Sequence, residues 1–289
     1  MIEFVNATLN LGLNILRKRP DGYHELSTLF YPVGIFNGSP QNPEPFCDIL
    51  EINPSRGRES TYRFTGNHVD CEPDRNLAVK ALREFEKAMS LKGLKCRPVD
   101  LVLEKHIPDG AGLGGGSADA SFTLRMLNSI HGNPLQVEEM VNIAARIGAD
   151  CPFFILNRPV MARGIGEIMT PSDVSLDGYW AVIVKPSVYI STKEAFASIK
   201  PEEPDVSLEE IVSRPVDKWR ELGLHNDFEP GIFARHPRLG EIKEQLYMSG
   251  AVYSAMSGSG SSIFGIFRTR DEALRAMKPF REQAYICRL

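Results

Sequence analysis

Pro108-Asp-Gly-Ala-Gly-Leu-Gly-Gly-Gly-Ser-Ala-Asp-Ala-Ser121 is the stretch of the 289-residue sequence that decides the fold, because five glycines precede Ser117 and helix-forming residues follow it. Glycine adopts positive φ and lets another backbone approach closely, so successive amides of such a loop can point at one anion. Ser117 is the predicted N-cap of the following helix, whose positive end would face the same anion. The stretch therefore predicts a phosphate-binding loop, with a nucleotide as the first ligand to consider.

Two better-known glycine-rich motifs fit this stretch less well. A Walker A loop ends in Lys-Ser or Lys-Thr, whereas Gly116 precedes Ser117 here. Gly110, Gly112 and Gly115 match the dinucleotide pattern G-x-G-x-x-G after a strand-like run, but no acidic strand-end residue follows at the expected distance. An NAD-dependent dehydrogenase is therefore the most distant alternative. A surface turn without a ligand rarely needs five glycines in seven positions.

The composition is that of a globular protein without a specialised surface. The length suits one large or two medium domains. The formal net charge of -4 and the pI of about 5.9 provide no general basic field, so we expect no nucleic-acid or membrane partner and only local phosphate binding. Five cysteines without Cys-x-x-Cys spacing argue against a zinc site or a disulfide scaffold. Together with an N-terminus that lacks a leader pattern, they predict a cytoplasmic protein with reduced thiols.

The apolar patterning predicts a mixed α/β (α+β) chain. It opens with a hairpin of strands over 4–16 and 28–35, joined by a turn at 18–22. Further strands are expected at 48–52, 62–64, 99–104, 153–155, 160–162, 180–184, 252–254, 262–267 and 284–287. Helices are expected at 76–89, 117–130, 137–147, 192–199, 238–248 and 270–280. The proline-containing and acidic stretch 200–216 is expected to be a surface connection.

A second cluster of small residues occurs near the C-terminus as Ser257-Gly-Ser-Gly-Ser-Ser262. On its own it is equally well a flexible hairpin loop. With residues 6–13 and 108–121, however, it resembles the three motifs of the GHMP kinase superfamily. This resemblance implies a two-domain α/β fold with mixed and antiparallel sheets flanked by helices, and ATP as the phosphoryl donor. The expected domains are 1–157, with the phosphate loop, and 158–289.

A more specific resemblance lies in Lys18-Arg-Pro-Asp-Gly-Tyr-His-Glu-Leu26, in Thr28-Leu-Phe30 and in Ile147-Gly-Ala-Asp-Cys-Pro-Phe153. These segments are similar to the diphosphocytidyl-methylerythritol kinases of the bacterial non-mevalonate isoprenoid pathway. The resemblance implies phosphorylation of a hydroxyl of 4-diphosphocytidyl-2-C-methyl-D-erythritol. A GHMP-type kinase for mevalonate or homoserine, and a weakly active nucleotide-binding homologue, remain alternatives.

The resemblance also implies roles for residues of the acceptor site. Asp150 matches the general base, and hydroxyl phosphorylation does need a carboxylate near the acceptor proton; a helix-terminal acid satisfied by nearby amides is the structural alternative. Asn10 matches a polar residue that lines the same site. Tyr23 and His24 match the cytosine site, and Phe196 matches a ring that stacks on the base.

A longer set of residues matches positions that bind ATP or close the phosphate site. Asn76 and Lys105 match positions near the adenine, and Ser117 is also the candidate Mg²⁺ ligand, because hard cations prefer oxygen. The expected ATP-binding residues are Asn76, Lys105, Pro108, Gly110, Gly112, Gly114, Gly115, Gly116, Ser117 and Asp119, and those of the third motif are Gly258, Ser259 and Gly260.

One residue departs from the family pattern. Asn6-Ala7 is followed by Thr8, where the resemblance expects a lysine near the catalytic aspartate. A cation there would depress the pKa of the carboxyl group and orient the acceptor hydroxyl. Either Asp150 suffices, another cation such as Lys18 or Lys185 substitutes, or turnover is low. We favour the first explanation because the other motifs are intact. A monomer and a homodimer are both compatible with the sequence.

Overall fold

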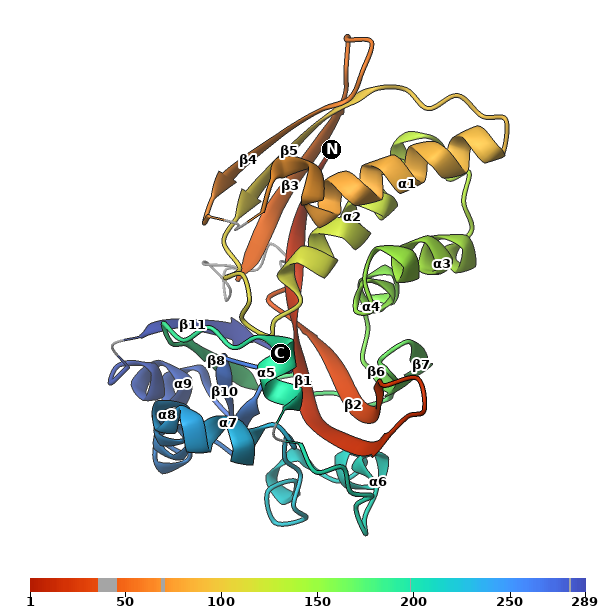
Figure 1. The fold of residues 1–289 in the computed structure, drawn as a ribbon. Coiled ribbons are helices and arrows are strands. Elements are labelled where there is room, and N and C mark those ends of the chain that lie inside the picture. Colours follow the sequence, from red (N-terminus) through yellow and green to blue (C-terminus); the bar gives the residue numbers. More distant parts are fainter. Residues whose placement is uncertain (36–45, 69–70, 198, 281) are drawn as a thin grey trace. The chain divides into compact units, whose positions relative to one another are not determined.

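The computed structural model describes residues 1–35, 46–68, 71–197, 199–280 and 282–289, which form two compact units (Figure 1). Unit 1 comprises Met1–Ala7, Cys47–Asp109 and Gly114–Asn157, and unit 2 comprises Thr8–Phe46, Gly110–Leu113 and Arg158–Leu289. After Asn157 the chain remains in unit 2. The two units are not continuous halves of the chain, because the opening hairpin and part of the glycine-rich stretch belong to unit 2.

Four strands open the chain, and runs of helices and strands follow them. The strands are β1 (Ile2–Lys18), β2 (His24–Val33), β3 (Cys47–Pro54), β4 (Thr61–Gly66), β5 (Val99–Lys105), β6 (Val160–Gly164), β7 (Ile168–Pro171), β8 (Trp180–Lys185), β9 (Tyr253–Met256), β10 (Ile263–Phe267) and β11 (Gln283–Arg288). The helices are η1 (Pro73–Arg75), α1 (Leu77–Leu91), α2 (Gly115–Ile130), α3 (Val137–Ile147), α4 (Cys151–Leu156), α5 (Thr192–Phe196), α6 (Leu208–Val212), η2 (Val216–Lys218), α7 (Glu229–Arg235), α8 (Pro237–Met248) and α9 (Arg270–Met277).

Unit 1 is a sheet covered by helices. Its strands follow the order β4-β5-β3-β1, with β4 parallel to β5 and the other pairs antiparallel. Helix α2 packs against β3, and α1 packs against α2 (Figure 1). The apolar positions of α1 recur at helical spacing and bury Leu82, Phe85 and Met89. This packing fixes the N-terminal end of α2, where the glycine-rich stretch enters the helix.

Unit 2 contains the remainder of β1 and a second sheet. The part of β1 from Thr8 onward neighbours β2, and the order within this part of the sheet is β1-β2-β6-β7. The second sheet is antiparallel and has the order β11-β8-β10-β9. Helices α8 and α9 pack against this second sheet. Its core includes Val182, Val184, Ile242, Leu246 and Phe267. The two sheets with flanking helices confirm the predicted α/β class.

The sequence prediction was correct for the hairpin and for most elements, but it did not include η1, β7 or α7 and it differs from the structure at three further places. Residues 153–155 were predicted as a strand but lie in α4, because a short apolar run has no period that separates a buried strand from a buried helix. Ser117 is not the N-cap of α2: Gly114 occupies that position and the helix begins at Gly115. The predicted connection 200–216 contains α6 and η2. Residue 198, in the predicted helix 192–199, lies outside the described residues.

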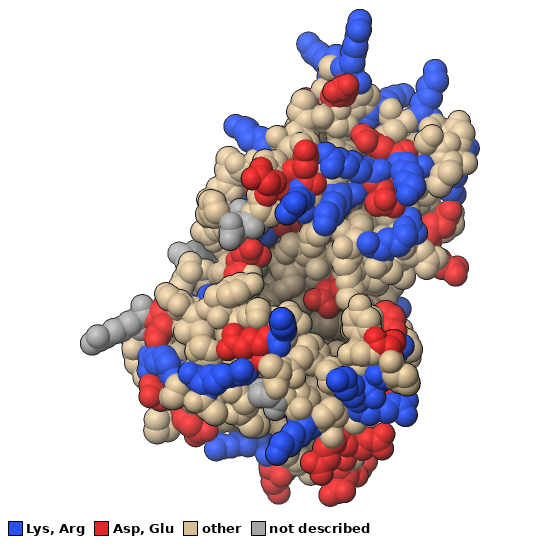
Figure 2. Space-filling view, viewed as in Figure 1, with Lys and Arg blue, Asp and Glu red and all other residues tan. Residues whose placement is uncertain are grey.

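The molecular surface has no single-sign character on the face that Figure 2 shows. Lysine and arginine side chains alternate there with aspartate and glutamate over each unit. No helix among the described residues has both the length and the apolar character that a bilayer crossing requires.

Candidate active site

The glycine-rich stretch adopts the backbone conformation for which glycine is needed. Gly110, Gly112 and Gly114 have φ of +58°, +72° and +68°. A Cβ atom added to Gly112 would lie 2.2 Å from the carbonyl oxygen of Ser257, so no side chain fits there. Gly114 then caps α2 in the left-handed conformation. The predicted loop therefore leads into a helix N-terminus, where free backbone amides can bind an anion.

The second cluster of small residues contacts the first within unit 2. The hydroxyl of Ser257 donates a hydrogen bond to the carbonyl of Gly112 (2.7 Å), and the amide of Ser262 donates to the carbonyl of Ala111 (3.1 Å). Asn10 lies beside the same loop, since its backbone amide donates to the Ser257 hydroxyl (3.3 Å). Gly258 and Gly260 have positive φ, and Ser259 is half-buried. Three segments that are distant in sequence therefore meet here.

Asp150 and Ser117 lie in neighbouring turns of unit 1. The Ser121 hydroxyl on α2 donates to the carbonyl of Cys151 on α4 (2.7 Å), and Ser117 is a hydrogen-bond partner of the Cys151 thiol. Asp150 occupies the N-cap position of α4, but its side chain makes no capping hydrogen bond. Burial raises the pKa of its carboxyl group. Its carboxylate is thus available next to the start of α2, rather than consumed as a helix cap.

Lys105 was expected near the adenine, and the structure places its side chain in a buried ionic cluster. Its ammonium group contacts the carboxylates of Asp48 and Asp119, the latter at 2.6 Å. The other Asp48 oxygen accepts the amide hydrogens of His106 (2.6 Å) and Ile107 (2.8 Å). The cluster joins the end of β5 to Asp119 in the second turn of α2. The Lys105 charge is therefore neutralised within the protein.

Two carboxylates share one ammonium ion in this cluster. Asp119 Oδ1 is buried and has no hydrogen-bond partner among the described residues. Burial raises the pKa of Asp119 to about 8, against the opposing attraction of Lys105. Asp119 therefore retains a proton at a pH where an exposed aspartate would be ionised.

Asn76 lies at the edge of a pocket in unit 1. The pocket encloses about 260 Å³, and Phe64 and Asn67 also line it. The Asn76 side chain caps α1, because its Oδ1 accepts the amide hydrogen of Ala78 (2.9 Å). Pro108 is half-buried at the other end of the segment that follows β5. The pocket has an aromatic side chain and amide groups, which suit a flat polar ring.

The residues expected to bind the cytosine lie in unit 2. His24 and Phe196 are stacked, with ring centroids 4.8 Å apart and an interplanar angle of 22°. Phe228 packs edge-on against Phe196 at 4.9 Å. The side chain of Tyr23 is 61% exposed. The structure thus brings His24 and Phe196 together, while the ring of Tyr23 faces solvent.

Thr8 is buried at the position where the family resemblance implied a lysine. It is 2% exposed, and its hydroxyl donates to the carbonyl of Tyr31 (3.2 Å). Of the two possible substitutes, Lys18 is exposed, and Lys185 donates to the carbonyls of Pro186 (2.7 Å) and Val188 (3.2 Å). Burial lowers the pKa of Lys185. Both lysines lie in unit 2, and the cause of the raised pKa of Asp150 is its burial.

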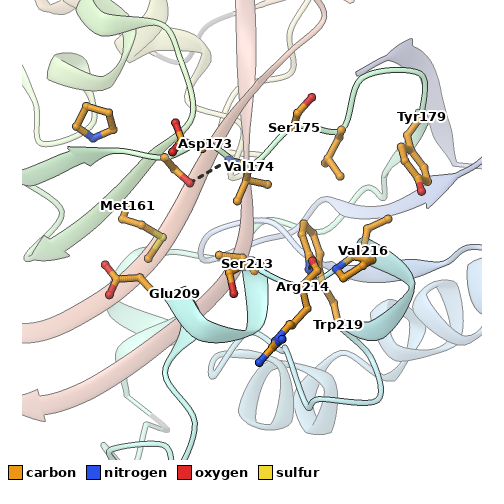
Figure 3. Close-up of a pocket in the computed structure, with 15 residues that line it drawn as sticks. Met161, Asp173, Val174, Ser175, Tyr179, Glu209, Ser213, Arg214, Val216 and Trp219 are labelled. Atoms are coloured by element: carbon orange, nitrogen blue, oxygen red, sulfur yellow. Dashed lines mark hydrogen bonds between the residues drawn. The ribbon is translucent and has the colours of Figure 1, made fainter.

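A further cavity in unit 2 contains none of the predicted site residues. It encloses about 650 Å³ between the segment after β7 and the segment around α6 (Figure 3). Met161, Val174 and Trp219 line it, and Ser172 accepts a hydrogen bond from the Val174 amide (3.4 Å). Its charged lining residues are Asp173, Glu209 and Arg214, and we do not include it in the candidate site because no predicted site residue lines it.

Two residues of the site region had no signal in the sequence. Asp48 holds the Lys105 ammonium ion from a strand 57 residues earlier in the chain. Asn226 is fully buried and contacts the backbone on either side of Ser257. A single aspartate in a strand or asparagine in a loop is common, so only the three-dimensional contacts reveal them.

Comparisons with known proteins agree with this geometry. Residues 76–158 match the model of the GHMP kinases N terminal domain, and residues 208–286 match that of the GHMP kinases C terminal domain. The chain is 48% identical over 272 residues to a 4-diphosphocytidyl-2-C-methyl-D-erythritol kinase of Bacteroides fragilis, covering 94% of each protein.

Solved structures point the same way. A crystal structure of 4-(cytidine 5'-diphospho)-2C-methyl-D-erythritol kinase superposes with a TM-score of 0.80 at 31% identity, covering 99% of this chain and 98% of the other. The mevalonate kinase of Methanococcus jannaschii, at 10% identity and a TM-score of 0.70 over 100% and 98% of the two chains, shares the fold. With relatives this similar along almost its whole length, the chain belongs to the GHMP kinase family and is a small-molecule kinase.

Proposed function

We propose that this kinase phosphorylates a hydroxyl group of 4-diphosphocytidyl-2-C-methyl-D-erythritol. The relatives of 48% and 31% identity carry the name of that enzyme. The observation that carries the proposal is Asp150, whose carboxylate does not cap α4 and whose chain neighbours Gly148 and Cys151 lie against Ser117 at the start of α2. A carboxylate in this position is suited to accept the proton of an alcohol while the phosphate tail is held nearby.

ATP supplies the γ-phosphoryl group in this family. The segment from Gly110 to Ser117 would hold the phosphates, because its positive-φ glycines and the N-terminus of α2 present backbone amides. The close approach of Ser257 to Gly112 leaves room for backbone only, as such a turn requires. The pocket beside Asn76 would receive the adenine.

Magnesium would be held in the same region. No group of three or more acidic, histidine or cysteine side chains suited to a metal occurs within the described parts of the chain. We propose that phosphate oxygens and water would hold the Mg²⁺ ion, with Ser117 as a protein ligand, because hard cations prefer oxygen. Its positive charge would offset that of the phosphate oxygens.

The acceptor would be recognised through its cytosine. The imidazole of His24 would bond to the base edge, and the rings of Phe196 and Tyr23 would contact its face; such stacking is worth about 1–3 kcal/mol. In this role His24 and Phe196, now in contact, must let the base approach an outer ring face or separate. Asn10 would contact the remainder of the acceptor, and Asp150 would accept the hydroxyl proton.

Low turnover is the second candidate reading, and the burial of Thr8 favours it. Within the described parts of the chain, burial is the cause that raises the pKa of Asp150, and no cation offsets it. The base would then be fully ionised only at higher pH. We nevertheless favour an active enzyme, because phosphoryl transfer depends mainly on positioning and charge stabilisation. We also propose that it works in the cytoplasm, since the five cysteines are free thiols.

A coupled ADP-release assay with a panel of acceptors tests the proposal. We expect turnover with the cytidine-linked alcohol and none with mevalonate or homoserine. Asp150→Asn tests the proposed base, because it keeps the shape of the side chain and removes the base. We expect kcat to fall about 10²- to 10⁴-fold. Turnover with mevalonate or homoserine would replace the proposed acceptor, and ATP binding without turnover would support the second reading.

A further inference from the structure

We propose that Asn226 is a positioning residue for ATP, which acts by fixing the loop Ser257–Ser262 against Gly112. This rests on the proposed phosphate-binding role of the glycine-rich stretch. Asn226 lies 30 residues before Met256 and is fully buried in unit 2. It reaches the loop only through backbone carbonyls, and the loop in turn contacts the glycine-rich stretch.

The side chain of Asn226 uses both hydrogens of its amide on the loop. Nδ2 donates to the carbonyl of Met256 (2.8 Å) and to the carbonyl of Gly258 (2.8 Å), while Oδ1 accepts the amide hydrogen of Phe228 (2.9 Å). Because Nδ2 faces two carbonyl acceptors and Oδ1 faces a backbone donor, the orientation of the side-chain amide is defined. The two carbonyls flank Ser257, so Asn226 fixes the backbone on both sides of that residue.

Ser257 transmits this position to the glycine-rich stretch. Its hydroxyl donates to the carbonyl of Gly112 (2.7 Å) and accepts from the amide of Asn10 (3.3 Å). The Ser257 carbonyl oxygen lies only 2.2 Å from the position that a Cβ atom of residue 112 would take. Any displacement of Ser257 therefore moves the backbone of Gly112, or removes the hydrogen bond that holds it.

The segment that carries Asn226 is itself held firmly. The amide of Leu13 on β1 donates to the carbonyl of His225 (2.9 Å), and the amide of Asp227 donates back to the carbonyl of Leu13 (2.9 Å). From the other side, Glu229 Oε1 accepts the amide hydrogen of Met256 (2.8 Å) and Oε2 pairs with Lys243 (2.5 Å). Asn226 thus connects a fixed strand to the loop, which is what a positioning role requires.

Asn226→Asp removes both donors and places an oxygen against two carbonyls, while the acceptor for Phe228 remains. We expect the KM for ATP and the Kd of a non-hydrolysable ATP analogue to rise about tenfold or more, which corresponds to about 1.4 kcal/mol. The kcat at saturating ATP and the KM for the acceptor should change much less. Amide hydrogen exchange at Ser257, Gly260 and Ser262 should accelerate, because those amides are hydrogen-bonded within this loop region.

Asn128→Asp is the matched control. Asn128 is also a buried asparagine. Its side chain bonds to both the carbonyl and the amide of Leu135 in unit 1, away from the glycine-rich stretch. It should lose stability without weakening ATP binding. Equal weakening in both variants, or unchanged ATP affinity in Asn226→Asp, would overturn the proposal.

If Asn226→Asp does not fold, Ser257→Ala decides the matter, because it removes the link to Gly112 without burying a charge. ATP affinity should fall, and an unchanged value would overturn the proposal. Binding of the analogue does not depend on the acceptor. An enzyme that binds it but phosphorylates no member of the panel would therefore refute the proposed acceptor and leave the role of Asn226 testable.

Discussion

Replacing Gly112 by alanine tests the contact between the two small-residue segments directly. The residue has φ of +72°, and its new Cβ atom would lie 2.2 Å from the Ser257 carbonyl oxygen. An L-residue in the left-handed region costs about 1–2 kcal/mol, and losing the hydrogen bond between Ser257 and Gly112 costs about 1 kcal/mol more. We therefore expect the free energy of unfolding to fall by about 2–3 kcal/mol.

The assay combines denaturant unfolding with calorimetric titration of a non-hydrolysable ATP analogue. A displaced loop would lose one charge-assisted hydrogen bond to phosphate, so the Kd should rise roughly ten- to a hundredfold. Gly250→Ala is the control, because Gly250 has φ of +97° and no atom within 4 Å of the added Cβ. It should show the backbone strain alone. Equal losses of stability in both variants, with unchanged Kd, would refute the reasoning.

The remaining predictions concern charge and recognition. Thr8→Lys should raise kcat and move the acidic limb of its pH profile to lower pH, because a cation near Asp150 would lower the raised pKa of its carboxyl group; an unmoved limb and an equal or lower rate would show that the missing charge is not limiting. His24→Ala should raise the KM for the cytidine-linked acceptor and leave the Kd of the ATP analogue nearly unchanged, whereas equal weakening of both would remove His24 from the base pocket. Asp119→Asn should abolish a loss of stability with rising pH. The pKa of Asp119 is about 8 in the folded protein and lies above its ordinary value of 3.8, so the native protein binds more protons and is destabilised as pH rises between those values. Parallel pH–stability curves for the two proteins would contradict this.

The sequence predicted elements whose apolar residues follow a clear period. The opening hairpin and α3 were found because their apolar residues recur at strand or helix spacing and turn or capping residues bound them. Residues 153–155 were misassigned because three apolar residues have no measurable period. The sequence did not predict the short helices α6 and α7. They contain acidic residues, and α7 also contains a proline, so tertiary packing rather than a local apolar pattern defines them.

The candidate site was predictable only where a local motif marks it. The glycines and Asp150 were identified through segments that are contiguous in the chain. The buried partner of Lys105 and the contacts of Asn226 join residues 57 and 30 positions apart, and pairing over such distances leaves no local pattern. The resemblance implied a position near the adenine for Lys105 but not its contacts with Asp48 and Asp119, because burial and ion pairing depend on the folded structure.

Neither compact unit is a continuous piece of chain, since residues 8–46 and 110–113 leave the first half to join the second. Cutting the polypeptide after Asn157 would thus yield one fragment with surplus segments and another with missing ones. Both fragments would expose apolar side chains, and we expect them to aggregate when expressed singly and to recover structure only when produced together. Because distant segments must meet before either core closes, folding should also be slow relative to that of helical proteins of similar size.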